Sequence, residues 1–381
     1  MSKKIIIISP IEVKWLNETR SIYLKIFKSL LNSEILNVDN YKSFVFPKNY
    51  ICIYFPIFYA GFSKLSYNLT FKRVKRYWLV DNFPTYNEFH NYTNLSLKVI
   101  SQSNSSIAYL HEYDMHDYAT SDFKKDIVDF YNSYLLTPGS ELFDFEFCQN
   151  ISKPDIPIKI NESVNNFLKD QRKRIISLTH VIDLQDQKNM IFKKKRFLKY
   201  ACIGAMYYLR REFMLILLKR NYLLGFVISI FFLVNYKISS KILPLKYRLS
   251  WLKLFQKKLL NNVYYCFICG STSGHFVRKY LEVPLSGSII ISPPYLFMKR
   301  LGFIENYHYK PYPIEQKMLN RLGNNKDENI PYIRKNCFEL ISELHSFQAR
   351  LNQLNESLDL IASNNFNGSY WENGEYKHYS Q

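Results

Sequence analysis

One block of sequence near residue 270 constrains the fold of this chain more than any other part. Val263–Cys269 (VYYCFIC) is a short apolar run of aromatic and β-branched residues, and the small residues of Gly270–Gly274 (GSTSG) follow it directly. They predict a buried strand that ends in a turn, and His275–Gly287 (HFVRKYLEVPLSG) predicts a helix that begins at that turn. The first N–H groups of such a helix are unpaired and lie at the positive end of its dipole. The block therefore predicts an anion-binding site.

The predicted helix carries charged side chains close to this site. Arg278 and Lys279 come within its first residues and Glu282 lies one turn further on, which suits a ligand with both a phosphate and sugar hydroxyls. The alternative is that Glu282 is solvated and that both cations are ordinary surface charge. His275 also has two interpretations, as a hydrogen-bond partner of a phosphate or as an exposed residue at the helix start. The candidate ligand-binding residues are Gly270, Ser271, Thr272, Ser273, Gly274, His275, Arg278, Lys279, Glu282, Ser286 and Gly287.

A family resemblance covers about residues 260–360, and three segments carry it. Arg278–Ser292 (RKYLEVPLSGSIIIS) resembles the signature of the C-terminal half of GT-B glycosyltransferases, especially the group related to the spore maturation protein CgeB. Leu301–Glu305 (LGFIE) resembles a Gly-Phe element that follows this signature. Arg334–Leu360 resembles the closing helices of such enzymes, with their His-x-(Phe/Trp)-x-x-Arg pattern at His345–Arg350.

The resemblance implies an α/β fold of two Rossmann-like domains facing a cleft, the second of which binds a nucleotide-sugar donor. In such enzymes the carboxylate at the position of Glu282 accepts hydrogen bonds from the ribose hydroxyls of the donor. Many of them carry a second glutamate eight residues earlier that contacts the sugar, and this chain has Gly274 there. The sugar and the stereochemical outcome therefore do not follow from the resemblance. No Asp-x-Asp motif stands out, and we expect no metal and no cofactor besides the donor substrate.

The 381 residues are enough for two domains. In the first half, apolar runs predict strands at Lys4–Ser9, Tyr50–Phe55, Tyr77–Val80, Ser106–Leu110 and Ser133–Leu136. A helix is predicted within Asn17–Leu31, and alternating strands and helices imply a parallel sheet. Lys173–Leu178 (KRIISL) is interpreted as the first strand of the second domain. The predicted layout is an N-terminal acceptor-side domain (1–151), a linker and helix (152–172), a C-terminal nucleotide-sugar-binding domain (173–345), a closing helix (346–362) and a flexible tail (363–381).

Polar residues follow two of the predicted strands of the first domain. Asp81 comes directly after Tyr77–Val80, and His111 and Asp114 come after the strand that ends at Leu110. Ligands of parallel α/β sheets bind at the carboxyl ends of the strands, and an inverting transferase needs a base for the acceptor hydroxyl. Each of these residues also suits a helix cap or a solvated loop. Asp81, His111 and Asp114 are the candidate catalytic residues.

The positive charge of the chain is concentrated in one stretch. The net charge is +19, and residues 187–260 contain 17 Lys or Arg and a single acid, Glu212. Within it, Tyr222–Val234 is an apolar run flanked by cations. The run is shorter than the about 20 residues that span a bilayer, so an interfacial helix, a buried core helix and a span assisted by its flanks are all open. The scarcity of acids favours an interfacial helix on an anionic membrane, within a basic apolar helical insert at about 187–260.

The compartment is inferred from the start of the sequence and from its cysteines. Ile5–Ile8 is too short for the apolar region of a signal peptide, and no disulfide framework is evident. We therefore expect a cytoplasmic protein, peripherally associated with the inner membrane. Cys266 and Cys269 form a CxxC pair that lies in the predicted strand. Its use for zinc or redox chemistry is open, and a place in the strand core is favoured.

These observations lead to one principal functional hypothesis. A bacterial glycosyltransferase at the cytoplasmic membrane face would move a sugar from a nucleotide-sugar to a lipid-linked or surface polysaccharide, such as capsule, O-antigen or lipopolysaccharide. The alternative is a catalytically inactive, membrane-associated scaffold of glycan assembly, which Gly274 and the weak candidates for a base motivate. Nucleic-acid binding would use the same positive charge, but the continuous apolar run in 187–260 suits lipid better, so we expect no nucleic-acid partner.

Overall fold

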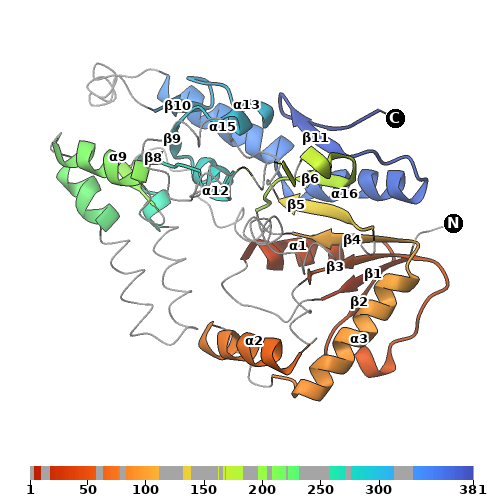
Figure 1. Cartoon of the computed structure of the whole chain (residues 1–381). Helices are drawn as coiled ribbons and strands as arrows, with labels where there is room; N and C mark the ends of the chain where they lie inside the picture. The colour runs from red at the N-terminus through yellow and green to blue at the C-terminus, as the bar shows by residue number, and fades with distance from the viewer. Residues whose placement is uncertain are drawn as a thin grey trace.

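The computed structural model describes residues 4–9, 18–56, 63–77, 83–110, 132–138, 162, 166–167, 169–182, 196–203, 208–219, 222–230, 258–270, 276–312 and 329–380. Within these ranges the chain forms two parallel β-sheets with helices packed against them, and a hairpin near the C-terminus (Figure 1). The predicted α/β class with parallel sheets is confirmed.

Six parallel strands form the first sheet, in the order β2-β1-β3-β4-β5-β6. Their bounds are β1 Lys4–Ile8, β2 Ser33–Leu36, β3 Tyr50–Tyr54, β4 Ser105–Tyr109, β5 Tyr134–Pro138 and β6 Ile175–Leu178. Strands β1, β3, β4 and β5 confirm four of the strands predicted in the first half of the chain. Strand β2 was not predicted, because its four residues SEIL are mixed in polarity and only the last is buried at this edge of the sheet.

Three helices accompany the first sheet: α1 (Glu18–Lys28), α2 (Lys64–Tyr77) and α3 (Tyr86–Gln102). Helix α1 confirms the helix predicted within Asn17–Leu31, and its apolar face is buried through Ile22, Ile26 and Phe27. The strand predicted at Tyr77–Val80 is wrong at its first residue, because Tyr77 ends α2. Residues 78–80 lie outside the described ranges.

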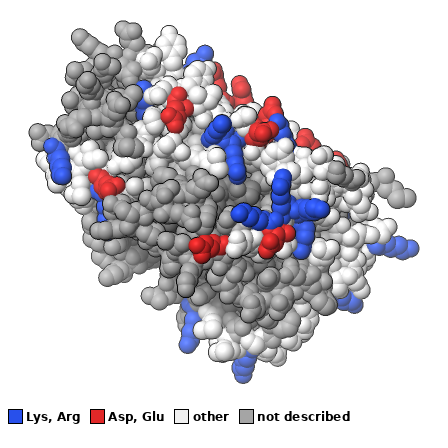
Figure 2. All heavy atoms as spheres, turned by 45° about the horizontal axis from the view of Figure 1, so that its top comes forward, with Lys and Arg blue, Asp and Glu red and all other residues white. Residues whose placement is uncertain are grey.

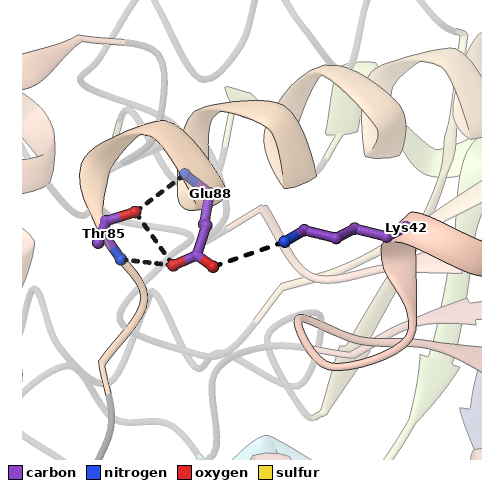
Figure 3. Close-up of polar contacts among 3 residues, drawn as sticks. All are labelled: Lys42, Thr85 and Glu88. Carbon is purple, nitrogen blue, oxygen red and sulfur yellow. Dashed lines mark hydrogen bonds and ion pairs between the residues drawn. The ribbon is translucent and has the colours of Figure 1, made fainter.

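The start of α3 is fixed by a capping box (Figure 3). The Thr85 hydroxyl accepts a hydrogen bond from the backbone N–H of Glu88, and the Glu88 carboxylate accepts one from the backbone N–H of Thr85 at 3.1 Å. The backbone N–H and the hydroxyl of Thr85 both donate to this carboxylate, and they, and then Lys42 with its Nζ 3.7 Å from it, lower the pKa of Glu88. Further along α3, the Tyr92 hydroxyl donates to the carbonyl of Ser9 at 2.6 Å. The cap therefore sets the register in which α3 meets the carboxyl end of β1.

Four parallel strands form the second sheet, in the order β10-β9-β8-β7. They are β7 Leu198–Cys202, β8 Val263–Phe267, β9 Ile289–Ser292 and β10 Tyr309–Pro311. Strand β8 confirms the strand predicted from VYYCFIC, and β9 lies at the end of the RKYLEVPLSGSIIIS signature. The helices of this part are α9 (Tyr208–Lys219), α12 (Lys279–Leu285), α13 (Leu296–Arg300) and α15 (Ile330–Leu344). Separate apolar clusters cover the two faces of this sheet.

Lys173–Leu178 contains a strand as predicted, but its assignment to the second domain was wrong. Its residues Ile175–Leu178 form β6, which pairs in parallel with β5 as the sixth strand of the first sheet. An apolar run predicts that a strand forms and does not specify its neighbour. Helix α16 (Phe347–Ala362), which coincides with the closing helix predicted over 346–362, packs against β6 and α1. The C-terminal part of the chain therefore returns to the first sheet.

The prediction of a flexible tail over 363–381 was also wrong for the residues described up to 380. β11 (Ser369–Glu372) and β12 (Glu375–His378) form an antiparallel hairpin. Its turn, Asn373-Gly374, has positive φ angles of 50° and 89°, the conformation that an Asn-Gly hairpin turn requires. The hairpin is anchored on both parts of the protein: Trp371 Nε1 donates to the Ser177 carbonyl of β6 at 2.7 Å, and the Gly374 N–H donates to the Arg300 carbonyl of α13 at 2.8 Å.

The stretch 187–260 was predicted to be a basic apolar insert, and part of it belongs instead to the second sheet and its packing. β7 is an edge strand of that sheet, and α9 packs against it. Two of the cations of the stretch, Arg196 and Arg210, are buried, with 8% and 2% of their surface exposed. Residues 223–230 form a further helical segment, and 231–257 lie outside the described residues. None of the described helices is long and apolar enough to cross a membrane.

Candidate functional site

The carboxyl ends of β7, β8 and β9 meet at one edge of the second sheet, because the strands are parallel. Polar groups join the segments that follow these strands. The backbone N–H of Gly270 donates to the hydroxyl of Tyr295 at 3.1 Å, and the hydroxyls of Tyr280 and Ser292 lie 2.7 Å apart. Ligands of open α/β sheets bind at this edge. The Gly270 N–H, which the sequence assigned to a phosphate, is engaged by Tyr295 instead.

Helix α12 begins at this edge, but later than predicted. Its first residue is Lys279 and not His275, and Ser271–His275 lie outside the described residues. Phe276 precedes the helix fully buried and stacks on Tyr280, and its carbonyl lies 3.1 Å from His180 Nε2 beyond β6. A helix of seven residues has a small dipole. Charged side chains therefore have to provide most of any anion binding here.

At the start of α12 the partly buried Arg278 forms an ion pair with the buried Glu282. Arg278 Nη2 lies 2.6 Å from Glu282 Oε1, and the two side chains are 17% and 7% exposed. The interpretation of Glu282 as a solvated surface residue is therefore wrong. The guanidinium fixes the orientation of the carboxylate, and removing either partner of such a pair leaves the other charge buried without its counter-ion.

Lys279 and Arg210 bring two more cations to the same edge. Lys279 Nζ donates to the carbonyl of Ile203, just beyond β7, at 3.5 Å. The pKa of Lys279 is lowered to about 8, first by burial and then by the charge of Arg210, and Glu282 opposes both effects. Burial raises the pKa of the Cys202 thiol to about 12, and the two cations oppose that rise. Two partly or fully buried cations that repel each other form a place where an anion is stabilised.

Arg210 was not among the residues predicted for the site, although the sequence contains a signal for it. It lies on α9 at the same helical face as Phe213, Met214 and Leu217, which are buried beside the second sheet. The spacing i, i+3, i+4 and i+7 places all four on one face. A cation on an otherwise apolar face is a candidate for an internal role, which the total charge of the stretch conceals.

Ser286 and Gly287 lie at the other end of α12, about 10 Å from its start at about 1.5 Å per residue. The guanidinium of Arg196 donates to the Ser286 carbonyl, and Arg334 Nε donates to the Gly287 carbonyl at 2.6 Å. Gly287 has a φ of 75°, the left-handed conformation that glycine adopts where a helix ends. These residues hold the far end of α12, and the structure does not place them with Arg278, Lys279 and Glu282.

The remaining predicted residues divide into two groups. Asp81, His111 and Asp114, the candidate catalytic residues, lie outside the described ranges. Cys266 and Cys269 are buried thiols in and just after β8, where burial raises the pKa of the Cys266 thiol. Among the described side chains, no group of three or more His, Cys, Asp or Glu could hold a metal ion.

Behind the site, the His-x-Phe-x-x-Arg pattern forms a buried cluster between the two sheets. Arg350 is fully buried, and its guanidinium donates to Thr179 Oγ1, just beyond β6, and to His345 Nδ1. It also lies over the ring of Trp371, with 4.8 Å between the guanidinium carbon and the ring centroid. The hydroxyl of Tyr23 on α1 donates to the Thr179 carbonyl. Helices α1 and α16 and the hairpin are thereby joined at the carboxyl end of β6.

His345 completes this cluster as a neutral side chain. Burial, and then the charge of Arg350, hold its pKa well below the usual value. With Nδ1 accepting from Arg350, Nε2 carries the proton and donates to the Leu301 carbonyl at 3.0 Å. The pattern that the sequence associates with closing helices therefore has a positioning role, since it fixes the end of β6 from which His180 reaches the start of α12.

Comparison with known proteins finds matches among solved structures and none among family models or curated proteins. Among solved structures, Anabaena Alr3699/HepE in complex with UDP aligns with 94% of this chain and 100% of its own length, at 8% identity and a TM-score of 0.47. The N-terminal domain of Candida albicans trehalose-6-phosphate phosphatase aligns with 95% of this chain and 97% of its own length, at 10% identity and a TM-score of 0.46. OtsA without ligand aligns with 94% of this chain and 99% of its own length, at 8% identity and a TM-score of 0.40. At these scores the likeness supports no assignment of activity.

Proposed function

We propose that this protein is a glycosyltransferase that moves a sugar from a nucleotide-sugar donor to a lipid-linked or surface polysaccharide acceptor at the cytoplasmic face of a membrane. The observation that carries the proposal is the group of Arg210, Arg278, Lys279 and Glu282 at the carboxyl edge of the second sheet. Three of these described side chains are cationic and one is a buried carboxylate. The resemblance of RKYLEVPLSG to a donor-binding signature supports the same assignment.

Each side chain has a role that its chemistry suits. Lys279 and Arg210 hold the diphosphate of the donor and stabilise the negative charge that develops on it when the sugar leaves. Glu282, oriented by Arg278, accepts hydrogen bonds from the ribose hydroxyls. Two cations supply the charge neutralisation, so the proposal needs no metal. The base that activates the acceptor is proposed, on the sequence alone, to be one of Asp81, His111 and Asp114.

A binding experiment tests this proposal. UDP, GDP, CDP, CMP and dTDP are titrated against the full chain and against Glu282→Gln and Lys279→Met. We expect one nucleotide to bind the wild type and to bind each variant about tenfold or more weakly, since a lost charged hydrogen bond costs about 1.5–3 kcal/mol.

The chain offers a matched control for the carboxylate. Lys335 and Glu339 on α15 form another i,i+4 pair, 3.6 Å apart, whose side chains are 69% and 47% exposed. Glu339→Gln removes the same charge from a solvated pair, and we expect it to leave nucleotide affinity unchanged. If the wild type binds none of the nucleotides, the protein is no nucleotide-sugar transferase, and a non-catalytic scaffold of glycan assembly becomes the better hypothesis. Unchanged binding in both site variants would remove this edge of the sheet from the donor site.

A further inference from the structure

The helical segment 223–230 packs on the protein through Gly225 and Ser229 and through the half-buried Phe226 and Ile228. Gly225 lies so close to β7 that an added Cβ would be 2.5 Å from the Tyr200 carbonyl oxygen. One turn later, Ser229 Oγ accepts a hydrogen bond from the backbone N–H of Cys202 at 3.0 Å and donates to the Gly225 carbonyl at 2.7 Å. Because β7 is an edge strand, the segment covers backbone that would otherwise be exposed.

Four large apolar residues of the same segment are exposed. Leu223, Leu224, Val227 and Ile230 are 58%, 56%, 52% and 37% exposed. At about 100° per residue they occupy one face, opposite Gly225 and Ser229. The outer side of an ordinary surface helix is polar, whereas the outer side of this segment is apolar. An exposed contiguous apolar surface of this kind is a site of interaction.

Helix α9, which precedes this segment in the chain, also exposes apolar residues. The chain passes from α9 into the segment through a hydrogen bond from the Tyr222 N–H to the Leu217 carbonyl at 2.9 Å. On α9, Leu215 and Leu218 are 53% and 40% exposed, and the exposed cations Arg211 and Lys219 lie on the same face. We define the outer face as Leu215, Leu218, Leu223, Leu224, Val227 and Ile230.

The charge of the surrounding chain identifies the partner. Residues 187–260 contain 17 cations and one acid, whereas the other residues contain 34 cations (51 − 17) and 31 acids (32 − 1). On the face of the molecule that Figure 2 draws, basic and acidic side chains of the described residues are intermixed. The excess of positive charge is therefore local to the part of the chain that carries the outer face.

We propose that the outer face docks on an anionic lipid bilayer, with its leucines, valine and isoleucine in the interface and the exposed cations of α9 on the headgroups. The inference rests on the proposed membrane location and gives it a surface, and it does not depend on the donor site. Apolar contact and attraction of cations to anionic lipid are the two forces that bind an interfacial helix. Two copies of the same basic surface would repel each other, so charge argues against self-association through it.

Vesicle binding of the full chain tests the inference. Co-sedimentation is measured with vesicles of phosphatidylcholine alone and of phosphatidylcholine with phosphatidylglycerol. The variant replaces Leu223→Gln, Leu224→Gln and Val227→Thr together. We expect the wild type to bind the anionic vesicles far more tightly than the neutral ones, and the variant to bind them about tenfold or more weakly, because three apolar side chains no longer enter the interface.

The control and the nucleotide titration make each outcome decisive. Leu31→Gln with Val45→Thr changes two apolar residues that are 80% and 78% exposed on the first domain, and it should leave vesicle binding unchanged. The outer-face variant should bind nucleotide like the wild type, so failure of the donor site is separable from failure of docking. Equal vesicle binding by the wild type and the variant would overturn the inference, and so would equal binding of the wild type to neutral and anionic vesicles. A third outcome would also overturn it: no vesicle binding, together with a wild-type dimer in light scattering that the variant does not form.

Discussion

Replacing Lys279 with methionine should stabilise the empty protein while it weakens nucleotide binding. The ammonium group is held at the edge of the second sheet by burial and next to the charge of Arg210, and both effects lower the pKa of Lys279. A cation in such a place costs folding free energy that only a bound anion recovers. Methionine has a similar length, carries no charge and fills the same space.

The pKa gives the size of the effect. A fall from 10.5 to about 8 corresponds to about 3 kcal/mol of folding free energy at neutral pH, at about 1.4 kcal/mol per pKa unit. Loss of the hydrogen bond from Nζ to the Ile203 carbonyl offsets about 1 kcal/mol of this gain. Lys279→Met should therefore raise the free energy of unfolding by about 2 kcal/mol at pH 7.

The gain should disappear at high pH, and the sign follows from the order of the two pKa values. Below about pH 8 the lysine is protonated in the folded and the unfolded chain, so the cost of the buried charge is complete. Between about 8 and 10.5 the folded protein releases its proton first, the unfolded chain binds more protons, and the stability of the wild type rises with pH. Above 10.5 both states are neutral and the advantage of methionine is gone.

Denaturant unfolding of the wild type and Lys279→Met at several pH values between 7 and 10.5 measures this difference. Other titrating groups cancel, because they are common to both proteins. Lys335→Met, at a lysine whose side chain is 69% exposed, is the control and should change stability little at any pH. A Lys279→Met variant that is less stable than the wild type at pH 7, or a difference that does not vary with pH, would show that Lys279 is a structural contact and not a strained anion ligand.

Two further changes test how the C-terminal part of the chain joins the two sheets. Arg350→Met should lower the free energy of unfolding by about 2–4 kcal/mol, because Thr179 and His345 lose their buried hydrogen-bond donor. Denaturant unfolding measures this change, and a value under about 0.5 kcal/mol would contradict the role of the cluster. A chain that ends at Ala362 should lose about 3–5 kcal/mol of unfolding free energy, since it lacks Trp371, which is 3% exposed and hydrogen-bonded to β6. A thermal midpoint equal to that of the full chain would show that the hairpin does not hold the sheets together.

Local composition predicted the strands well, and it could not predict their partners. Runs such as Ile5–Ile8 and Val263–Phe267 are so strongly apolar and β-branched that only a buried strand suits them. Ile175–Leu178 has the same character, but its pairing with β5 is decided by the packing of α16 against it, which lies far away in the sequence. The hairpin was missed for a different reason. Asn373-Gly374 is a strong turn signal, and the short polar and aromatic strands beside it have no periodicity of their own.

The candidate site shows the same limit at the level of side chains. Arg278 and Glu282 were assigned separately to the ligand, and the structure pairs them with each other, as residues four apart on a helix can do. Ser286 was assigned to the same site because it lies in the same sequence signature, yet it lies at the opposite end of α12, where Arg196 binds its carbonyl. A sequence signature thus combines residues that touch the ligand with residues that hold the ligand-binding element in place.

Adjacent residues of α9 show why the charge of the basic stretch had to be divided before it could be interpreted. Arg210 is buried next to Lys279, whereas Arg211, about 100° further round the helix, is exposed on the face of Leu215 and Leu218. One helix therefore contributes a cation to the proposed donor site from one side and presents part of the outer face from the other. With that face on a bilayer, the donor site would lie about one helix diameter, about 10 Å, above the lipid surface. An acceptor sugar attached to a lipid through a phosphate would then reach the donor without leaving the membrane, which connects the two proposals through a single element of the fold.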